Sequence, residues 1–211
     1  MSPARHTAPR MLVVEDDPLA ARAMSRLLGR GWPILHARSR ADALTIIEGS
    51  TPLAAAVVDL VLEDGDGMDV VARVREKRPN LPVLIVTGSL SESLVNRAAI
   101  LGATYVCKPD VAGALLAFAA RSLIWSHVTD EALRWRLEER ARAANLSLRE
   151  TQIATLFIAG TPRRELGERC GITENTVKTE VRVLLRKWPA GTLEQLASEL
   201  RQGTPMTAST S

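Results

Sequence analysis

The sequence is poor in cysteine and has no long hydrophobic segment. Cys107 and Cys170 are its only cysteines, and neither has His or Cys neighbours at ligand spacing, which argues against a disulfide framework and a zinc site. No apolar run approaches the roughly 20 residues that a membrane helix needs. The N-terminal decapeptide is followed only by the short apolar run 11–14, which does not suffice for a signal peptide. We therefore expect a cytoplasmic protein without a membrane segment.

The sequence also has little excess of charge of one sign, since it contains 27 Lys and Arg residues and 24 Asp and Glu residues. Residues 1–120 hold 13 basic and 13 acidic side chains, whereas residues 121–211 hold 14 basic and 11 acidic ones. The whole net charge of +3 thus falls in the second half. This asymmetry points weakly to nucleic acid as a partner of that half, although a solvated basic face explains it nearly as well.

A length of 211 residues favours two domains, and the first half alternates two kinds of segment. Short apolar, β-rich runs occur at 11–14, 32–37, 54–59, 82–87 and 104–108. Amphipathic helical patterns lie near 18–28, 40–48, 68–77, 92–101 and 111–124. Fivefold alternation of strand and helix is typical of an α/β fold, here a doubly wound five-stranded parallel sheet covered on both faces.

Polar residues stand where the predicted strands end. Glu15, Asp16 and Asp17 follow the first strand, and single polar residues end the third, fourth and fifth strands, namely Asp59, Thr87 and Lys108. In parallel sheets of this kind, ligands bind beyond the carboxyl ends of the strands. We therefore expect these side chains to meet in one pocket.

The residue types in this pocket favour phosphoryl transfer. Clustered carboxylates repel one another unless a cation neutralises them, and Mg²⁺ prefers oxygen ligands. Lys108 could neutralise a phosphoryl charge, and the Thr87 hydroxyl could donate to a phosphoryl oxygen. Asp59 would then be the nucleophile, with the metal balancing the charge.

Residues 10–122 resemble the receiver domain of two-component response regulators, which has a flavodoxin-like fold. The matching motifs are VVEDDP (13–18), VVDLVL (57–62) with Asp66-Gly67, VTG (86–88) and KP (108–109). The resemblance implies that Asp59 is the phosphoacceptor and that Mg²⁺ is bound by Asp16 directly, by Glu15 through water and by the Val61 carbonyl. It also implies a switch made of Thr87 and Tyr105.

One feature departs from this family, whose members often carry proline where this chain has Glu63. The loop Glu63-Asp64-Gly65-Asp66 is therefore very acidic, which leaves its geometry and the phosphoryl lifetime open. A calcium loop is not supported, because placing either Gly65 or Gly67 at its sixth position puts a leucine where the first ligand belongs.

The second half has only helical patterns. Leu133, Leu137, Ala141 and Ala144 form an apolar stripe in the segment 123–144, which predicts one connecting helix or two in tandem, packed on its own domain or forming a dimer. Capping and turn signals then predict four helices, which begin at Ser147, Arg163, Thr173 and Thr192. The tails 1–9 and 203–211 have the composition of disordered segments.

Residues 146–188 resemble the LuxR-type (NarL/FixJ-like) helix-turn-helix. Matching elements include Arg164-Glu165-Leu166, Gly171-Ile172 and Thr176-Val177-Lys178. The resemblance implies that the helix 174–187 enters the major groove of DNA. Base edges or nearby phosphates would be contacted by Lys178, Thr179 and Arg182, and the DNA backbone by Asn175, Thr176 and Lys187. Glu180 and Trp188 depart from the family pattern.

The prediction is a receiver domain (10–122), a linker helix (123–145) and a DNA-binding domain (146–202) of a transcription regulator that is not an enzyme. A sensor histidine kinase, promoter DNA and a second copy of the chain in a homodimer are its expected partners. One rival is a hydrolase with an aspartyl-phosphate intermediate, but such enzymes need a second Asp where this chain has Val61. Another is an unphosphorylated interaction module, against which the complete pocket argues.

Overall fold

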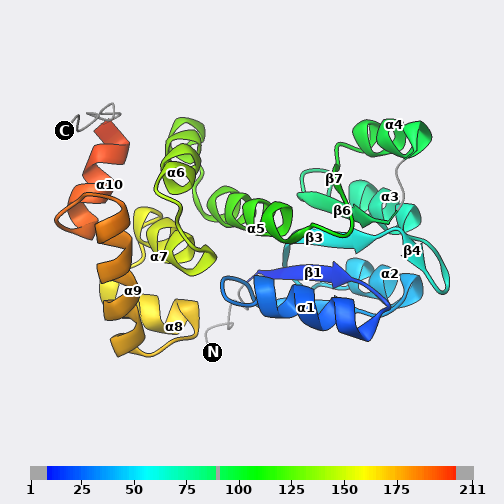
Figure 1. Cartoon of the computed structure of the whole chain (residues 1–211), viewed down its shortest axis with the longest axis horizontal. Coiled ribbons are helices and arrows are strands. Elements are labelled where there is room, and N and C mark those ends of the chain that lie inside the picture. The colour runs from blue at the N-terminus through cyan, green and yellow to red at the C-terminus, as the bar shows by residue number, and fades with distance from the viewer. Residues whose placement is uncertain (1–8, 89–90, 203–211) are drawn as a thin grey trace. The chain divides into compact units, whose positions relative to one another are not determined.

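The computed structural model describes residues 9–88 and 91–202, and its chain divides into two compact units at Ser122/Leu123 (Figure 1). Apart from Pro9, the tails for which the sequence predicts disorder lie outside the described residues.

A five-stranded parallel sheet forms the centre of the first unit, with the strand order β2-β1-β3-β6-β7. The strands are β1 (Arg10–Val14), β2 (Ile34–Ala37), β3 (Leu53–Asp59), β6 (Val83–Thr87) and β7 (Thr104–Cys107). This confirms the predicted α/β class and all five strands. The register pairs Asp59 with Val86 and Thr87 with Cys107, so the carboxyl ends of these strands lie at one edge.

Helices cover both faces of this sheet. They are α1 (Pro18–Leu28), α2 (Arg40–Glu48), α3 (Gly67–Lys77), α4 (Glu92–Ile100) and α5 (Ala112–His127). Leu12, Val58 and Ile85 project to the face where α2, α3 and α4 contribute to one hydrophobic cluster. Because side chains alternate along a strand, Met11, Val57 and Leu84 face the opposite side, and all are buried.

A short antiparallel hairpin follows β3 and was not predicted. It consists of β4 (Val61–Leu62) and β5 (Gly65–Asp66), joined by the turn Glu63-Asp64. The sequence predicts only an acidic loop for this segment. Two-residue strands are too short for an alternating pattern to reveal them.

The second unit is helical throughout its described residues. It contains α6 (Glu131–Ala143), α7 (Leu148–Ile158), a 3₁₀ turn (Arg163–Glu165), α8 (Leu166–Cys170), α9 (Glu174–Lys187) and α10 (Leu193–Gln202). The predicted local signals are confirmed: Ser147 and Glu150 form a capping box, and Thr173 caps α9. Gly171 has a φ of 65°, a left-handed conformation that favours glycine, at the turn between α8 and α9. No helix in the described parts of the chain could span a bilayer.

The connecting segment forms two helices, since α5 ends at His127 and Asp130 caps α6 by accepting from the Leu133 N–H. Its apolar stripe packs inside its own unit. Leu137 is buried in a hydrophobic cluster that includes residues of α7, α9 and α10, and Ala141 is also buried. The structure therefore favours the first of the two roles predicted for the stripe, and these side chains are not available for a dimer contact.

Candidate functional site

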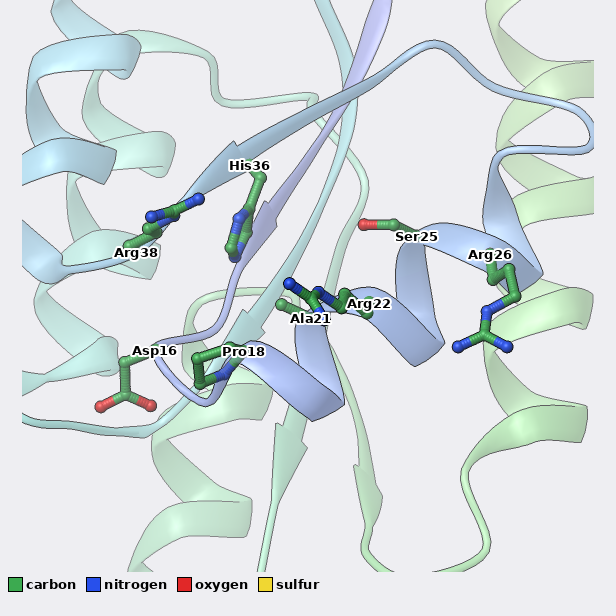
Figure 2. A pocket seen from close by; sticks show the side chains of 8 residues that line it. All are labelled: Asp16, Pro18, Ala21, Arg22, Ser25, Arg26, His36 and Arg38. Atoms are coloured by element: carbon green, nitrogen blue, oxygen red, sulfur yellow. The ribbon is translucent and has the colours of Figure 1, made fainter.

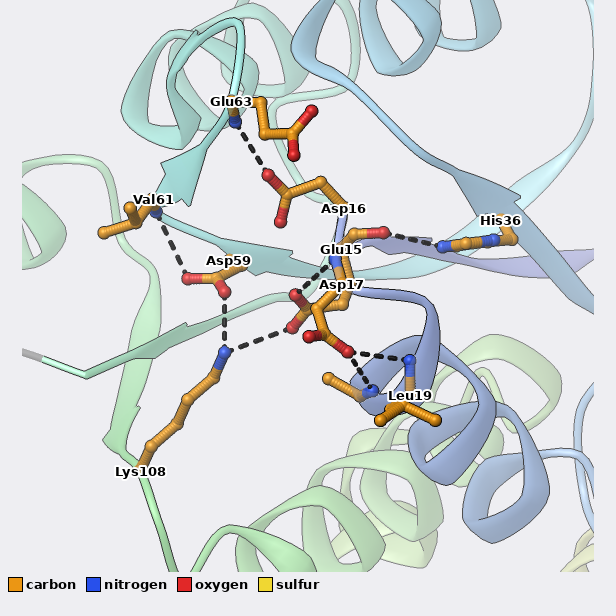
Figure 3. Close-up of polar contacts among 10 residues, drawn as sticks. Glu15, Asp16, Asp17, Leu19, His36, Asp59, Val61, Glu63 and Lys108 are labelled. Carbon is orange, nitrogen blue, oxygen red and sulfur yellow. Dashed lines mark hydrogen bonds and ion pairs between the residues drawn. The ribbon is translucent and has the colours of Figure 1, made fainter.

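Three of the polar residues predicted to converge, Glu15, Asp59 and Lys108, do meet at the carboxyl edge of the sheet. Glu15 directly follows β1, Asp59 ends β3 and Lys108 follows β7 (Figure 3). Thr87 ends β6. The β7 end is held to β6 by the Lys108 N–H, which donates to the Thr87 carbonyl over 2.8 Å. The parallel topology alone brings these distant segments together.

Lys108 bridges two buried carboxylates. Its Nζ lies 2.7 Å from Asp59 Oδ2 and 3.2 Å from Glu15 Oε2. Asp59 is 4% exposed and Glu15 is 1% exposed. Buried charges are costly unless they are paired, so this contact is what allows both acids to lie inside the fold.

The electrostatics leave the site short of positive charge. Burial raises the pKa of the Glu15 carboxyl above its ordinary value, and the negative charge of Asp59 raises it further, while Lys108 opposes both. Burial lowers the pKa of Lys108, but its hydrogen bonds to Asp59 and Glu15 and their charges outweigh burial and raise it. When both acids are ionised, they share the one ammonium group of Lys108, which leaves one negative charge that a further cation would balance.

The backbone around Asp59 is fixed by Val61 and Gly67. The Val61 N–H donates to Asp59 Oδ1 over 3.2 Å. At the start of α3, the Gly67 N–H donates to the Leu60 carbonyl over 2.8 Å. A Cβ at position 67 would lie only 2.0 Å from the Asp59 carbonyl oxygen. Only glycine therefore allows α3 to begin this close to the end of β3.

The other two acids after β1 make different contacts. Asp17 caps α1, accepting from the Leu19 and Ala20 N–H groups. Asp16 Oδ2 accepts from the Glu63 N–H of the hairpin over 2.7 Å. Within residues 9–88 and 91–202, no three acidic, His or Cys side chains are grouped closely enough to hold a metal. Of the predicted metal ligands, the structure thus brings Glu15 and Asp59 together and directs Asp16 toward the hairpin.

Of the predicted switch residues, Thr87 is buried and Tyr105 is 40% exposed. Tyr105 lies on the edge strand β7, opposite Ile85, while Thr87 lies opposite Cys107. Because strand residues two apart share a face, Tyr105 is one repeat behind Thr87 on the same face of the sheet.

A cationic cleft lies between α1 and β2, and the sequence does not predict it. Its volume is about 670 Å³, and its lining includes Asp16 at one end, His36, and three arginines, Arg22, Arg26 and Arg38 (Figure 2). The spacing of four between Arg22 and Arg26 places them on one helix face, but only the fold adds Arg38, which directly follows β2.

Most of the residues predicted to contact DNA share the solvent face of α9. Val177, Val181 and Leu184 point into the core of the second unit. Five predicted contact residues are exposed, namely Asn175, Thr176, Lys178, Thr179 and Arg182. Lys178 pairs with Glu174 over 2.8 Å within the helix, and the pKa of Glu174 is lowered by this hydrogen bond and by the lysine charge.

Lys187 differs from the other predicted DNA contacts. Its Nζ lies 2.7 Å from Oε2 of the buried Glu150 and 3.1 Å from the Asn145 carbonyl oxygen. The same Glu150 oxygen also accepts from the Ser147 N–H of the capping box. Lys187 therefore joins the end of α9 to the start of α7.

Two family models match the chain. The response regulator receiver domain matches residues 11–119, and the luxR family of bacterial regulatory proteins matches residues 144–200. The chain is a response regulator. It therefore combines a receiver domain with a LuxR-type DNA-binding domain, as the sequence predicts, and response regulators of this type are typically not enzymes.

Similar response regulators and a solved structure agree with this assignment. The chain is 34% identical over 161 residues to the photosynthetic apparatus regulatory protein RegA of Cereibacter sphaeroides, covering 67% of this chain and 87% of that protein. It is 27% identical to the DNA-binding transcriptional activator DevR/DosR of Mycobacterium tuberculosis, covering 93% and 97%. Full-length FixJ from B. japonicum covers 95% of this chain and is covered completely, with a TM-score of 0.51 and 23% identity, and so supports the fold. The chain is thus homologous to transcription regulators.

Proposed function

We propose that this response regulator accepts a phosphoryl group on Asp59 from a sensor histidine kinase in the cytoplasm, and that phosphorylation controls its dimerisation and its binding to promoter DNA. The observation that carries the proposal is the buried contact of Lys108 with Asp59 and Glu15. The proposed receiver domain is 10–122, the linker 123–145 and the DNA-binding domain 146–202.

Asp59 is the group that reacts. Its carboxylate oxygen forms a bond to phosphorus as the bond from phosphorus to the kinase imidazole breaks, and the imidazole keeps the electron pair and takes a proton from solvent. Lys108 holds the carboxylate in place before transfer and neutralises phosphoryl charge afterwards. The arginines of the cationic cleft beside Asp16 raise the local concentration of an anionic phosphodonor.

The proposed cation is Mg²⁺, which receiver domains generally bind at the phosphorylation site. Two buried carboxylates with one ammonium between them leave an excess of negative charge that a divalent cation balances. Glu15, Asp16, Asp59 and the Val61 carbonyl would hold the ion. Bound there, Mg²⁺ neutralises charge that develops on the transferred phosphoryl group.

The response to phosphorylation is proposed to run through Thr87 and Tyr105. Thr87 lies at the site edge and would donate its hydroxyl to a phosphoryl oxygen, with Tyr105 changing its conformation on the same sheet face. Moving a two-state equilibrium from 1:99 to 99:1 requires about 5.5 kcal/mol, which a few ordered contacts can supply. On the DNA side, Lys178, Thr179 and Arg182 would contact bases or phosphates, and Asn175, Thr176 and Lys187 the backbone.

Intact-mass measurement after incubation with acetyl phosphate and Mg²⁺ tests the proposal. The wild-type chain should gain one phosphoryl group, and Asp59→Asn should gain none while keeping its fold, because the substitution removes the nucleophile and relieves carboxylate repulsion. Labelling of Asp59→Asn at the wild-type rate would show that another residue is the acceptor. Catalytic turnover of a generic phosphomonoester would instead indicate a hydrolase.

A further inference from the structure

The acidic hairpin β4–β5 contacts one of the proposed metal ligands directly. The Glu63 N–H donates to Asp16 Oδ2 over 2.7 Å, and the Asp16 carboxylate points toward Glu63 (Figure 3). Glu15 and Asp59 instead face Lys108, and Asp16 has no part in that contact. One oxygen of Asp16 is therefore engaged, and its orientation is fixed, by a backbone donor outside the pocket.

The hairpin is held in place by Asp64. Its Oδ1 accepts from the Arg40 N–H over 2.7 Å and its Oδ2 from the Ala41 N–H over 2.9 Å. These are the first two N–H groups of α2, and the Ser39 side chain satisfies only the third, that of Asp42. The bonds from Ala41 and Arg40 also lower the pKa of Asp64. Asp64 thus completes the cap of α2 and anchors the turn to it.

The other side of the hairpin is equally constrained. Gly65 has a φ of 146°, a backbone conformation that L side chains rarely adopt, so this position favours glycine. Asp66 caps α3 through the Met68 N–H over 2.8 Å. The acidic loop therefore uses Asp64 and Asp66 to join the starts of two helices, which fixes the Glu63 N–H between them.

We propose that the hairpin is a latch on Asp16, and that Asp64 is the positioning residue that keeps the latch closed. The inference rests on the proposed function, in which Asp16 is a ligand of Mg²⁺. For Asp16 to turn into the pocket, the hydrogen bond from the Glu63 N–H to its carboxylate must break. Hydrogen bonds to a charged acceptor are stronger than those to a neutral one, so breaking this bond costs free energy. A closed latch therefore lowers the affinity of the site for a divalent cation.

A matched pair of variants at position 63 tests the latch. Glu63→Pro and Glu63→Ala both remove the carboxylate, but only proline also removes the N–H. Glu63 is the first of the two central residues of the turn, a position that favours proline, and its φ is not positive. With Mn²⁺ as the probe and free Mn²⁺ followed by electron paramagnetic resonance, Glu63→Pro should bind about three- to ten-fold more tightly than Glu63→Ala.

A second pair tests Asp64. Asp64→Ala should bind Mn²⁺ more tightly than the wild-type chain, although the loss of a nearby negative charge by itself weakens cation binding. Asp69→Ala is the control, because it removes an equal charge that contacts Arg40 but leaves both backbone bonds of Asp64. It should bind Mn²⁺ no more tightly than the wild-type chain.

Two results would overturn the latch while leaving the proposed function intact. One is equal Mn²⁺ affinity of Glu63→Pro and Glu63→Ala; the other is weaker binding by Asp64→Ala than by Asp69→Ala, each in proteins with the wild-type circular dichroism spectrum. Saturable binding only after Glu63→Pro would support the latch strongly. Absence of saturable Mn²⁺ binding in every variant would overturn the metal site itself, and with it both proposals.

Discussion

The two units differ in whether their functional side chains are paired with one another inside the fold. At the sheet edge of the first unit, Glu15, Asp59 and Lys108 are paired with one another inside the fold. On α9 of the second unit, the exposed Lys178 pairs with Glu174 of its own helix. A reaction site must be organised before its substrate arrives, whereas a nucleic-acid surface is completed by its partner. The structure of one chain without its partners therefore shows the reaction site more completely than the nucleic-acid surface.

The largest expected effect breaks the organisation of the first unit. Gly67→Ala places a Cβ against the Asp59 carbonyl oxygen, so α3 or the end of β3 must move. We expect a loss of about 3 kcal/mol in the free energy of unfolding, together with loss of phosphorylation by acetyl phosphate. Urea denaturation and intact-mass measurement check the two effects.

Gly113→Ala is the matched control, because a Cβ at this position in α5 meets nothing within 4 Å. It should stabilise the chain by about 0.5 kcal/mol, the lower end of the range for Gly-to-Ala changes in helices, because Gly113 lies in the first turn of α5. Equal stabilities of the two variants would contradict the role given to Gly67.

The next prediction separates two lysines of α9 that the sequence predicts as DNA contacts. Lys187→Met leaves the buried Glu150 without its ion partner and should cost about 2 kcal/mol of unfolding free energy, less than a fully buried pair because Lys187 is partly exposed. Lys178→Met should leave stability nearly unchanged but weaken binding to all DNA sequences and reduce its salt dependence. Urea denaturation and DNA titrations at two salt concentrations measure both. If Lys187→Met behaved like Lys178→Met, the division between structural and surface lysines would be wrong.

Local patterns and parallel topology explain what the sequence could predict. The capping box Ser147/Glu150 and the turn at Gly171 depend on neighbouring residues, so short motifs reveal them. Asp59 and Lys108 are 49 residues apart, yet strand ends of a parallel sheet share one edge, which makes their meeting predictable.

Contacts that depend on side-chain direction or on irregular backbone could not be predicted. The bond from the Glu63 N–H to Asp16 needs a hairpin that leaves no periodic signal. The ion pair between Lys187 and Glu150 joins two residues that are 37 positions apart on different helices. No sequence pattern around either residue indicates it. The resemblance to a known family predicts that Lys187 contacts DNA, and the fold adds a contact to Glu150 within the unit.

The smallest expected effect lies on the solvent face of α9. Glu174→Gln weakens the hydrogen bond to Lys178 and removes a negative charge, so DNA affinity should rise about two- to three-fold at low salt. Because the folded-state pKa of Glu174 lies below its ordinary value of 4.5, its stabilising effect is present at neutral pH and is lost as the pH falls through the folded-state pKa. The stability difference between the variant and the wild-type chain should therefore shrink in urea titrations as the pH falls below the ordinary pKa of 4.5. A difference of the same size at neutral and at strongly acidic pH would argue against the ion pair as its cause.

The most direct test of the account is a DNA-binding isotherm of the full chain with and without phosphorylation, on promoter DNA selected by the chain and on random sequence, with Asp59→Asn as the control. If the site at the sheet edge governs the helical unit, acetyl phosphate with Mg²⁺ should change the affinity of the wild-type chain for the selected DNA by tenfold or more, about 1.4 kcal/mol, and leave Asp59→Asn unchanged. Identical isotherms for the fully phosphorylated and the unphosphorylated wild-type chain would contradict it.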